Sequence, residues 1–321
     1  MGRTGPAARG PCSQGINVDR RVFMTLVLAA GAAGPSRSLR AAEPQLQVTA
    51  LADQLWLIAG GGGNVLVFNS HDGVLMVDGG SPEHSAAVLR TVRGLTQTTQ
   101  VHTLFNTHWH WDQTGSNQTL GESGTQIIAH ENTRLWLGTD VELPWQHRKY
   151  HRLPPRARPN KTFYTTGALD FGGEHLDYGY LPQAHTDSDI YVYFRKANVL
   201  VAGDVVAAGV YPIIDYSTGG WLGGLAEANK TLLQLANGDT RIIPGVGAVR
   251  SRNDVQAELD MLLTVKQRLS KLLAQGMSIK DMIDAAPTHD LDAKWGDSSL
   301  LIANAWPGLV ARARELGVSI V

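Results

Sequence analysis

The sequence predicts a mixed fold of strands and helices, α/β or α+β, in one main domain. The composition is typical of a globular protein, with 43% hydrophobic and 18% charged residues among 321. Short apolar runs bounded by Gly, Asn, Asp and Ser, which are typical of buried strands, recur through the first two thirds of the chain. Amphipathic helical stretches fill the last third.

The expected strands and helices follow one another in two halves, and this pattern alone supports no finer fold class. The predicted strands are 55–58, 65–68, 74–77, 101–105, 125–129, 174–180, 190–194, 199–202 and 241–244. The predicted helices are 85–95, 131–137, 222–235, 254–274, 278–285 and 299–316. Residues 138–160, rich in proline, arginine and aromatic side chains, follow neither pattern. We interpret them as a flap over a functional site or, equally, as a surface excursion packed by its own aromatic side chains.

The chain is organised around residues 105–117, which read FNTHWHWDQTGSN. A predicted strand leads into this segment, and His108, His110 and Asp112 alternate along it. Alternate residues of an extended segment point the same way, so the three side chains can converge. Two neutral imidazoles and a carboxylate are ligands for zinc or iron. The alternative is a polar loop whose histidines pack against the two neighbouring tryptophans.

This segment resembles the HxHxDH motif of the metallo-β-lactamase superfamily, and the similarity extends from about residue 46 to the C-terminal region. It includes VDGG at 77–80, His185 in PQAHTDSD and Asp204 in VAGDVV. The resemblance implies an α+β fold, the four-layer αββα sandwich, with the metal at the strand-end edge between the two sheets. It assigns residues 43–321 to one catalytic domain.

The resemblance also implies a set of metal ligands. The three histidines of the first site map onto His108, His110 and His185. The second site would use an Asp, two His and a bridging Asp, and these positions hold Asp112, Gln113, Val246 and Asp204. Because an amide is a weak zinc ligand and valine is none, we expect one tightly held zinc ion, with Asp204 close or coordinating. The second site is expected to be weak or absent, and iron is the alternative metal.

A site of this kind predicts a metal-dependent hydrolase that acts through a metal-bound hydroxide. Three neutral histidines leave a position for water, and the ion lowers the pKa of that water toward ~7. Asp112 is placed to accept the proton and later to protonate the leaving group. Gln113 could hydrogen-bond the water or the substrate oxygen. The cleaved bond would belong to an ester, lactone, thioester or amide, including a β-lactam.

Two other functions stay open. A mononuclear iron oxidoreductase of the same fold, similar to the persulfide dioxygenases, would use His108, His185 and Asp204 as a facial set. A non-catalytic metal-binding protein would hold the ion without turnover. Metal identity and oxygen consumption distinguish the first, and inertness with metal bound distinguishes the second.

Several other residues are expected to support the site. Asp78, at the end of a strand, would support the metal loop from behind, and its simpler role is to cap the following helix. Tyr216 and Trp221, in the glycine-punctuated segment 211–221, are expected to form a wall of the substrate pocket. His130 is interpreted as structural or as a support of the site.

Residues 1–42 predict an N-terminal export signal. Residues 19–25, DRRVFMT, resemble a bacterial twin-arginine signal and lead into an apolar run at 22–33. That run is too short for a comfortable transmembrane helix. Cleavage would give a periplasmic or secreted chain with no stable membrane anchor and no cysteine, since Cys12 lies in the signal. The alternative is a disordered tail with a chance Arg-Arg pair.

The predicted mature chain is acidic. Residues 1–42 hold six of the 28 basic residues and one of the 29 acidic ones, so that 22 and 28 remain, a net charge of −6. This charge argues against nucleic acid or an anionic membrane surface as the main partner. A small-molecule substrate is the expected partner, and the sequence carries no signal for an oligomeric state.

Overall fold

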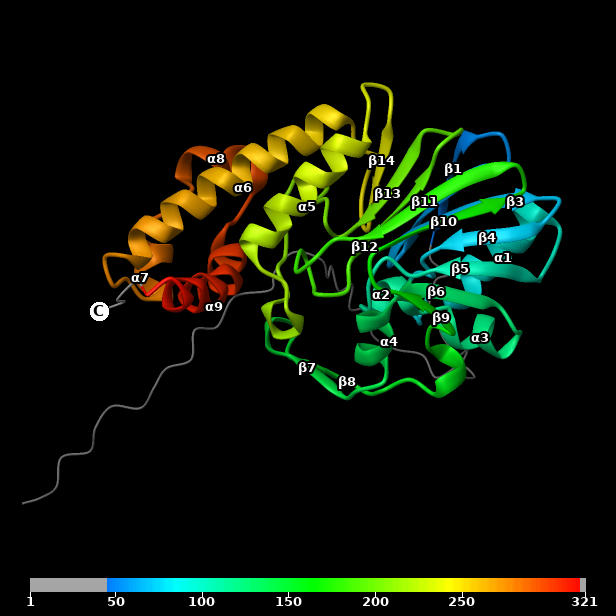
Figure 1. The fold of residues 1–321 in the computed structure, drawn as a ribbon, viewed down its shortest axis with the longest axis horizontal. Helices are drawn as coiled ribbons and strands as arrows, with labels where there is room; N and C mark the ends of the chain where they lie inside the picture. The colour runs from blue at the N-terminus through cyan, green and yellow to red at the C-terminus, as the bar shows by residue number, and fades with distance from the viewer. Residues whose placement is uncertain (1–44, 318–321) are drawn as a thin grey trace, which may run out of the picture. The chain divides into compact units, whose positions relative to one another are not determined.

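Two β-sheets lie face to face in the computed structural model, which describes residues 45–317 (Figure 1). The predicted export signal at 1–42 lies outside the described residues. The first sheet has the order β1-β2-β3-β4-β5-β6-β9. Its strands are β1 (Gln47–Ala52), β2 (Leu55–Gly61), β3 (Gly63–Ser70), β4 (Gly73–Val77), β5 (Val101–Phe105), β6 (Gln126–His130) and β9 (Lys161–Phe163). The strands from β1 to β4 pair antiparallel, and those from β4 to β9 pair parallel.

The second sheet has the order β10-β11-β12-β13-β14 and is antiparallel except for the last pair. Its strands are β10 (Thr166–Phe171), β11 (Glu174–Tyr180), β12 (Ile190–Phe194), β13 (Val199–Gly203) and β14 (Arg241–Pro244). A separate antiparallel pair is formed by β7 (Val141–Leu143) and β8 (Arg148–Tyr150).

Helices cover the outer faces of both sheets. The α-helices are α1 (Ser85–Thr96), α2 (Trp111–Thr114), α3 (Asn117–Glu122), α4 (Glu131–Leu137), α5 (Leu222–Leu235), α6 (Arg252–Leu273), α7 (Ile279–Asp284), α8 (His289–Trp295) and α9 (Ser299–Glu315). Short 3-10 helices are η1 (Pro144–Gln146), η2 (Pro155–Ala157) and η3 (Tyr216–Thr218). None of the helices within 45–317 is long and apolar enough to cross a membrane.

The strands bury both faces, and alternate residues enter different apolar clusters. In β3, Val65 and Val67 pack on the side of α1, while Leu66 and Phe68 pack between the two sheets. In the second sheet, alternate residues of β12 and β13 face either the first sheet or the cluster that holds α5, α6 and α9. Three apolar layers therefore separate helix, sheet, sheet and helix. The four-layer αββα sandwich, an α+β fold, is confirmed.

The predicted elements agree closely where the apolar signal is strong. The helix predicted at 222–235 and the strand predicted at 241–244 have the observed bounds. The sequence did not reveal β10, because four of its six residues are exposed or half-exposed polar or small side chains at a sheet edge. The aperiodic segment 138–160 contains the β7–β8 pair and two 3-10 turns.

A buried acid joins α6 to the segment after β13. Glu258 is 1% exposed, and both its carboxylate oxygens accept from the backbone N–H of Ala207, at 3.1 and 3.0 Å. Burial raises the pKa of Glu258 to about 8, against opposing effects of this hydrogen bond and of Arg250. The side chain is therefore protonated in the folded chain at neutral pH.

The Glu258→Gln variant is expected to be more stable than the natural chain at alkaline pH. The folded pKa of about 8 exceeds the ordinary value of 4.5, so the folded state holds a proton that the unfolded state releases between those values. The stability associated with this proton is complete below pH 4.5 and is lost as the pH rises through 8. The whole shift corresponds to about 5 kcal/mol of unfolding free energy. Glutamine imitates the protonated acid, so its unfolding free energy should lack this loss.

Urea unfolding at several pH values measures this difference. Glu142→Gln, on the exposed side of β7, is the matched control and should follow the natural chain. If Glu258→Gln and the natural chain lose stability in parallel between pH 5 and 9, Glu258 is not the responsible group.

Candidate metal centre

The loop after β5 carries the first two histidines and is held from behind by Asp78. The Asp78 side chain is 1% exposed and accepts from Thr107 twice, from the backbone N–H at 2.7 Å and from the hydroxyl at 2.8 Å. Burial raises the pKa of Asp78 well above its ordinary range, and the Thr107 hydrogen bonds oppose that rise. Helix α1 begins at Ser85 with His84 as its N-cap, so Asp78 does not cap it.

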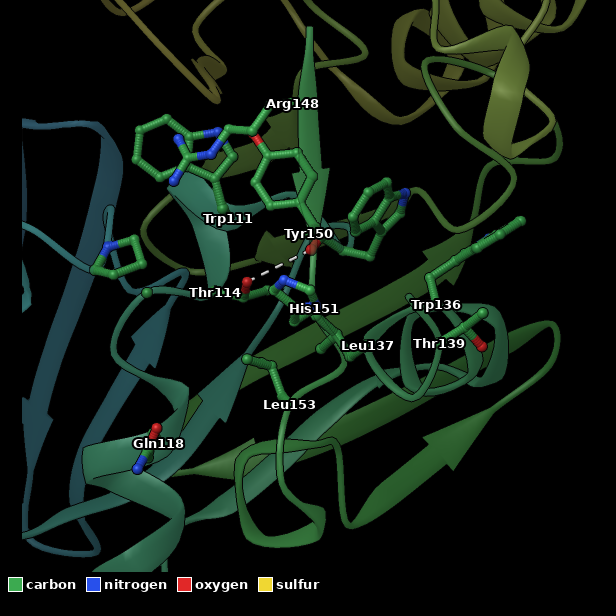
Figure 2. Close-up of a pocket in the computed structure, with 13 residues that line it drawn as sticks. Trp111, Thr114, Gln118, Trp136, Leu137, Thr139, Arg148, Tyr150, His151 and Leu153 are labelled. Atoms are coloured by element: carbon green, nitrogen blue, oxygen red, sulfur yellow. Dashed lines mark hydrogen bonds between the residues drawn. The ribbon is translucent and has the colours of Figure 1, made fainter. Parts of the chain in front are cut away.

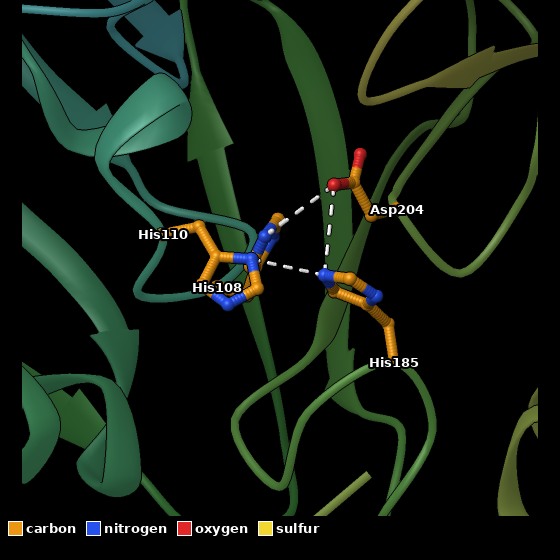
Figure 3. A group of neighbouring side chains, drawn as sticks. All are labelled: His108, His110, His185 and Asp204. Atoms are coloured by element: carbon orange, nitrogen blue, oxygen red, sulfur yellow. Dashed lines mark hydrogen bonds and ion pairs between the residues drawn. The ribbon is translucent and has the colours of Figure 1, made fainter. Parts of the chain in front are cut away.

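His185 and Asp204 reach the same point from the second sheet (Figure 3). One ligand atom from each of His108, His110, His185 and Asp204 lies within 4.8 Å of all the others. His110 Nδ1 and His185 Nε2 are 3.0 Å apart. Asp204 Oδ2 lies 3.7 Å from His108 Nε2 and 3.6 Å from His185 Nε2. We call these four residues the metal group.

Hydrogen bonds on the far sides of two rings leave their lone pairs facing this point. His110 Nε2 lies 3.1 Å from a carboxylate oxygen of Asp215, which can only accept, so Nδ1 carries the lone pair. His185 Nδ1 lies 2.8 Å from the Ile213 carbonyl oxygen, so its Nε2 carries the lone pair. Burial, followed by the nearby His110, lowers the pKa of His185 to about 4 and favours its neutral form.

The hydroxyl of Thr107 determines which ring nitrogen of His108 faces the metal group. The Thr107 hydroxyl donates to Asp78 and so accepts from His108 Nδ1, at 3.3 Å, which leaves the lone pair on Nε2. The His108 side chain is fully buried, and its Nε2 has no hydrogen-bond partner among the described residues. Burial and the two neighbouring histidines lower the pKa of His108 well below its ordinary value.

The arrangement of these ligand atoms is explained better by a small divalent cation between them than by hydrogen bonds among the four side chains. His110 Nδ1 and His185 Nε2 are 3.0 Å apart, and in the tautomers that their outer hydrogen bonds favour both present lone pairs, so neither donates to the other. Ligand atoms around a tetrahedral zinc, at Zn–N distances of 2.0–2.1 Å, lie roughly 3.3 Å apart. The observed separations of 3.0, 3.6 and 3.7 Å surround that value. Three imidazoles with one carboxylate are also the donors that zinc prefers.

Asp215 orients His110, and sequence reasoning missed it. Its side chain is fully buried, and it also accepts from the Thr218 hydroxyl at 2.6 Å. Burial alone would raise the pKa of Asp215, but its bonds to His110 and Thr218 lower it overall. The available signal was an acid directly after two isoleucines in the segment predicted as a pocket wall. An acid in so apolar a setting needs a buried partner.

The Asp215→Ala variant is expected to bind zinc about 10- to 100-fold more weakly, the usual effect of losing a group that orients a ligand. Asp215→Asn keeps an oxygen that can accept from His110 Nε2, so its loss should be smaller. Competition with a chromogenic chelator measures both dissociation constants. An alanine variant with unchanged affinity would show that the His110 ring is positioned by its packing alone.

Asp112 lies next to the metal group without joining it. Helix α2 begins at Trp111, so the alternation that aligns the two histidines ends before Asp112. Burial, followed by the nearby Asp204 carboxylate, raises the pKa of Asp112 to about 6. The Gln113 side chain is fully buried, with its Nε2 3.5 Å from an Asp112 oxygen. The roles expected of Asp112 and Gln113 stay predictions.

Asp204 and Val246 lie on neighbouring turns after β13 and β14. A Cβ atom at Gly245 would lie 1.9 Å from Asp204 Oδ1, so a glycine is needed there for Asp204 to hold its position. The Val246 side chain is 50% exposed. It lines the same cavity as His185 and Asp204. Weak or absent occupancy of a second metal site stays a prediction.

Tyr216 and Trp221 line a different cavity from the one at the metal group. Their cavity, of about 430 Å³, is completed by residues of α9 such as Ala311 and Arg312. The Lys266 ammonium of α6 lies 5.3 Å from the centroid of the Trp221 ring. Both aromatic side chains lie against α9, where a Cβ atom at Gly308 would be 3.2 Å from Trp221 Cβ and 3.5 Å from the Tyr216 ring.

Residues 138–160 pack beside the metal group. Val141 and Leu143 of this segment form one small buried cluster with Trp109 and with Leu137 of α4. The Trp145 ring centroid lies 6.0 Å from that of His110. Nearby, the Arg148 guanidinium lies 4.9 Å from the ring centroids of Trp111 and Tyr150, at a cavity of about 200 Å³ (Figure 2). The segment is thus packed by its own aromatic side chains and also flanks the site, and its movement as a flap stays a prediction.

Solved structures with a similar fold include metallo-β-lactamases. The metallo-beta-lactamase from Pontibacter korlensis has a TM-score of 0.56 and 20% identity, and the match covers 68% of this chain and 99% of that one. The DIM-1 metallo-beta-lactamase has a TM-score of 0.56 and 17% identity, with 69% and 99% covered. The stereoselective inverting sec-alkylsulfatase from Pseudomonas sp. has a TM-score of 0.64 and 14% identity, with 82% and 50% covered.

The family assignment comes from the sequence itself. No curated protein sequence matches the chain. At identities of 20% or less, the structural matches establish the fold alone. The sequence profile of the metallo-beta-lactamase superfamily matches residues 58–273, which is more than half of the chain. The chain therefore belongs to the metallo-β-lactamase superfamily.

Proposed function

We propose that the chain is a zinc-dependent hydrolase that cleaves an ester, lactone, thioester or amide bond of a small molecule. The observation that carries the proposal is the buried metal group, with three imidazole lone pairs and one carboxylate directed at one point. Membership of a superfamily of metal-dependent hydrolases agrees with it. When bound, zinc supplies a Lewis acid and lowers the pKa of water to about 7.

Different residues of the chain would bind the ion and transfer the proton. His108, His110 and His185 would hold it, with Asp204 on the fourth side. Asp112 is half-buried beside the group and is the carboxylate available to take a proton from the attacking water and return it to the leaving group. The Gln113 amide, 3.5 Å from Asp112, can orient that carboxylate.

Elemental analysis of protein purified without added metal, followed by a panel of esters, lactones, thioesters and β-lactams, tests the proposal. About one zinc per chain with turnover of a panel member is the expected result. Bound iron together with oxygen consumption would contradict the hydrolase assignment and indicate a mononuclear iron oxidoreductase. Stoichiometric zinc with no turnover by any panel member would favour the non-catalytic metal-binding protein.

We also propose that the chain is exported to the periplasm or beyond and acts on a small molecule there, without a stable membrane anchor and without nucleic acid as a partner. The Arg20–Arg21 pair before an apolar run supports export. The net charge of −6 after residue 42 argues against nucleic acid as a partner.

Replacing both Arg20 and Arg21 by lysine is expected to leave the unprocessed chain in the cytoplasm of a bacterial host. The replacement keeps the charge and removes the paired guanidinium groups that such a signal presents. Cell fractionation and mass spectrometry of the N-terminus measure the outcome. Arg37→Lys is the control, and equal export of all three chains would remove the twin-arginine assignment.

A further inference from the structure

We propose that the cavity beside His185 and Asp204 binds the hydrocarbon part of the substrate, so that the substrate is a neutral compound with an aliphatic or aromatic tail next to the cleaved bond. The cavity has a volume of about 400 Å³, and His185 and Asp204 of the metal group are among the residues that line it. The inference rests on the proposed hydrolysis for the bond that is cleaved, whereas binding of the tail depends only on the walls of the cavity. We call it the tail pocket.

The walls of the tail pocket are apolar. Beyond the two members of the metal group, the lining residues are Val206, Ala207, Ala208, Val210, Tyr211, Pro212, Ile213 and Val246. The single polar group among these side chains is the hydroxyl of Tyr211, which donates to Asp292 Oδ1 at 2.9 Å. The protein surface that a ligand in the tail pocket contacts is therefore mostly hydrocarbon, apart from the metal group and the Tyr211 hydroxyl.

Among residues 45–317, no lysine or arginine lines the tail pocket. Arg250 is close to Gly209, where a Cβ atom would lie 3.8 Å from its guanidinium nitrogens, but its charge pairs with Asp254 at 3.2 Å. Asp204 adds a carboxylate to the lining. A carboxylate, sulfate or phosphate on the tail would meet apolar walls with no counter-charge among the lining side chains, so the tail pocket selects against anionic tails.

Two valines leave large apolar surfaces open at this cavity. Val210 is 57% exposed and Val246 is 50% exposed. Single exposed apolar side chains are common, but two at the rim of a cavity that holds two of the metal group indicate a binding surface. Val246 therefore adds apolar surface, and no ligand atom, to the cavity that His185 and Asp204 also line.

Hydrogen bonds hold both sides of the tail pocket in place. On one side, the Tyr211 N–H donates to the Trp295 carbonyl at 2.9 Å, and the Ala207 N–H donates to Glu258. On the other side, the buried Asn64 amide donates to the carbonyls of Pro244 and Gly247, both at 2.9 Å, and so fixes the turn that presents Val246. A pocket formed before binding loses little conformational freedom when a ligand enters.

Displacement of the neutral fluorophore N-phenylnaphthylamine by n-butanol, n-hexanol and n-octanol tests the tail pocket without any reaction. Each added methylene should tighten binding about fourfold until the cavity is full. Val210→Asn should weaken n-octanol binding about tenfold. Val48→Asn is the matched control, since Val48 is 43% exposed on β1, outside the lining of the cavity, and it should bind n-octanol like the natural chain. Equal binding of all three alcohols, or an unaffected Val210→Asn variant, would overturn the inference.

Hydrolysis gives a second, separate measurement on the zinc-loaded chain. The value of kcat/KM should rise from p-nitrophenyl acetate to p-nitrophenyl octanoate. It should be more than about tenfold lower for the anionic p-nitrophenyl hemisuccinate than for the neutral pentanoate of the same length. Chain-length-dependent alcohol binding with no hydrolysis of any ester would support the tail pocket and contradict the proposed reaction. Hydrolysis with no preference for chain length or charge would contradict the tail pocket and leave the reaction in place.

Discussion

Replacing His110 by alanine is expected to remove the bound metal and, with it, the activity. The change deletes one of three imidazole lone pairs and leaves the fully buried Asp215 carboxylate without its ring partner. Since a group that merely orients a ligand contributes about 10- to 100-fold to metal affinity, loss of the ligand itself should cost more than about 100-fold. Metal content after dialysis and kcat/KM on the best substrate of the panel measure the two effects.

His175→Ala is the matched control for this change. His175 lies on β11, where its ring contacts Asp170 at 2.6 Å on exposed surface, outside the metal group. The control should retain the metal and the activity of the natural chain. A folded His110→Ala protein that keeps one metal per chain would show that His110 is not a ligand, and circular dichroism establishes whether the variant is folded.

Changing Asp112 to asparagine is expected to lower kcat about 10²- to 10⁴-fold while metal content stays the same. The amide has the shape of the carboxylate but cannot take a proton from water. Retention of the metal follows from the position of Asp112 outside the metal group. Rapid-mixing kinetics on zinc-loaded protein, together with elemental analysis, separate the chemical step from metal loss.

Asp140→Asn is the matched control, because it makes the same change of charge in the segment 138–160 that flanks the site. Asp140 is exposed in the segment before β7, where it accepts from the backbone of Arg152 at 2.9 Å. It should leave turnover unchanged. Full turnover by Asp112→Asn would exclude Asp112 as the proton acceptor, whereas loss of zinc from that variant would make Asp112 a ligand.

The fold could be predicted from local patterns wherever a strand buries both faces. Val74, Leu75, Met76 and Val77 of β4 are all fully buried, because alternate residues enter the two apolar clusters on either side of the sheet. A continuous apolar run is the expected signature of such a strand. The edge strand β10 is less buried than β4 on both faces, so its sequence lacks a continuous apolar run.

The metal group could be predicted in part from spacing. His108 and His110 lie in one short segment, and the resemblance added His185 and Asp204. Asp215 could not be found in this way, because its contact with His110 joins residues 105 positions apart and follows no local period. The placement of Tyr216 and Trp221 beside Gly308 of α9 is likewise a contact between residues far apart in the sequence, which no local pattern specifies.

The metal group draws two residues from each half of the chain. His108 and His110 follow β5 in the first sheet, whereas His185 precedes β12 and Asp204 follows β13 in the second. A chain emerging from the ribosome therefore holds two histidines long before the opposite half exists. The complete set of four ligands exists only after residue 204 has been synthesised and the two sheets have docked. The complete metal group is therefore a property of the folded chain and of neither half alone.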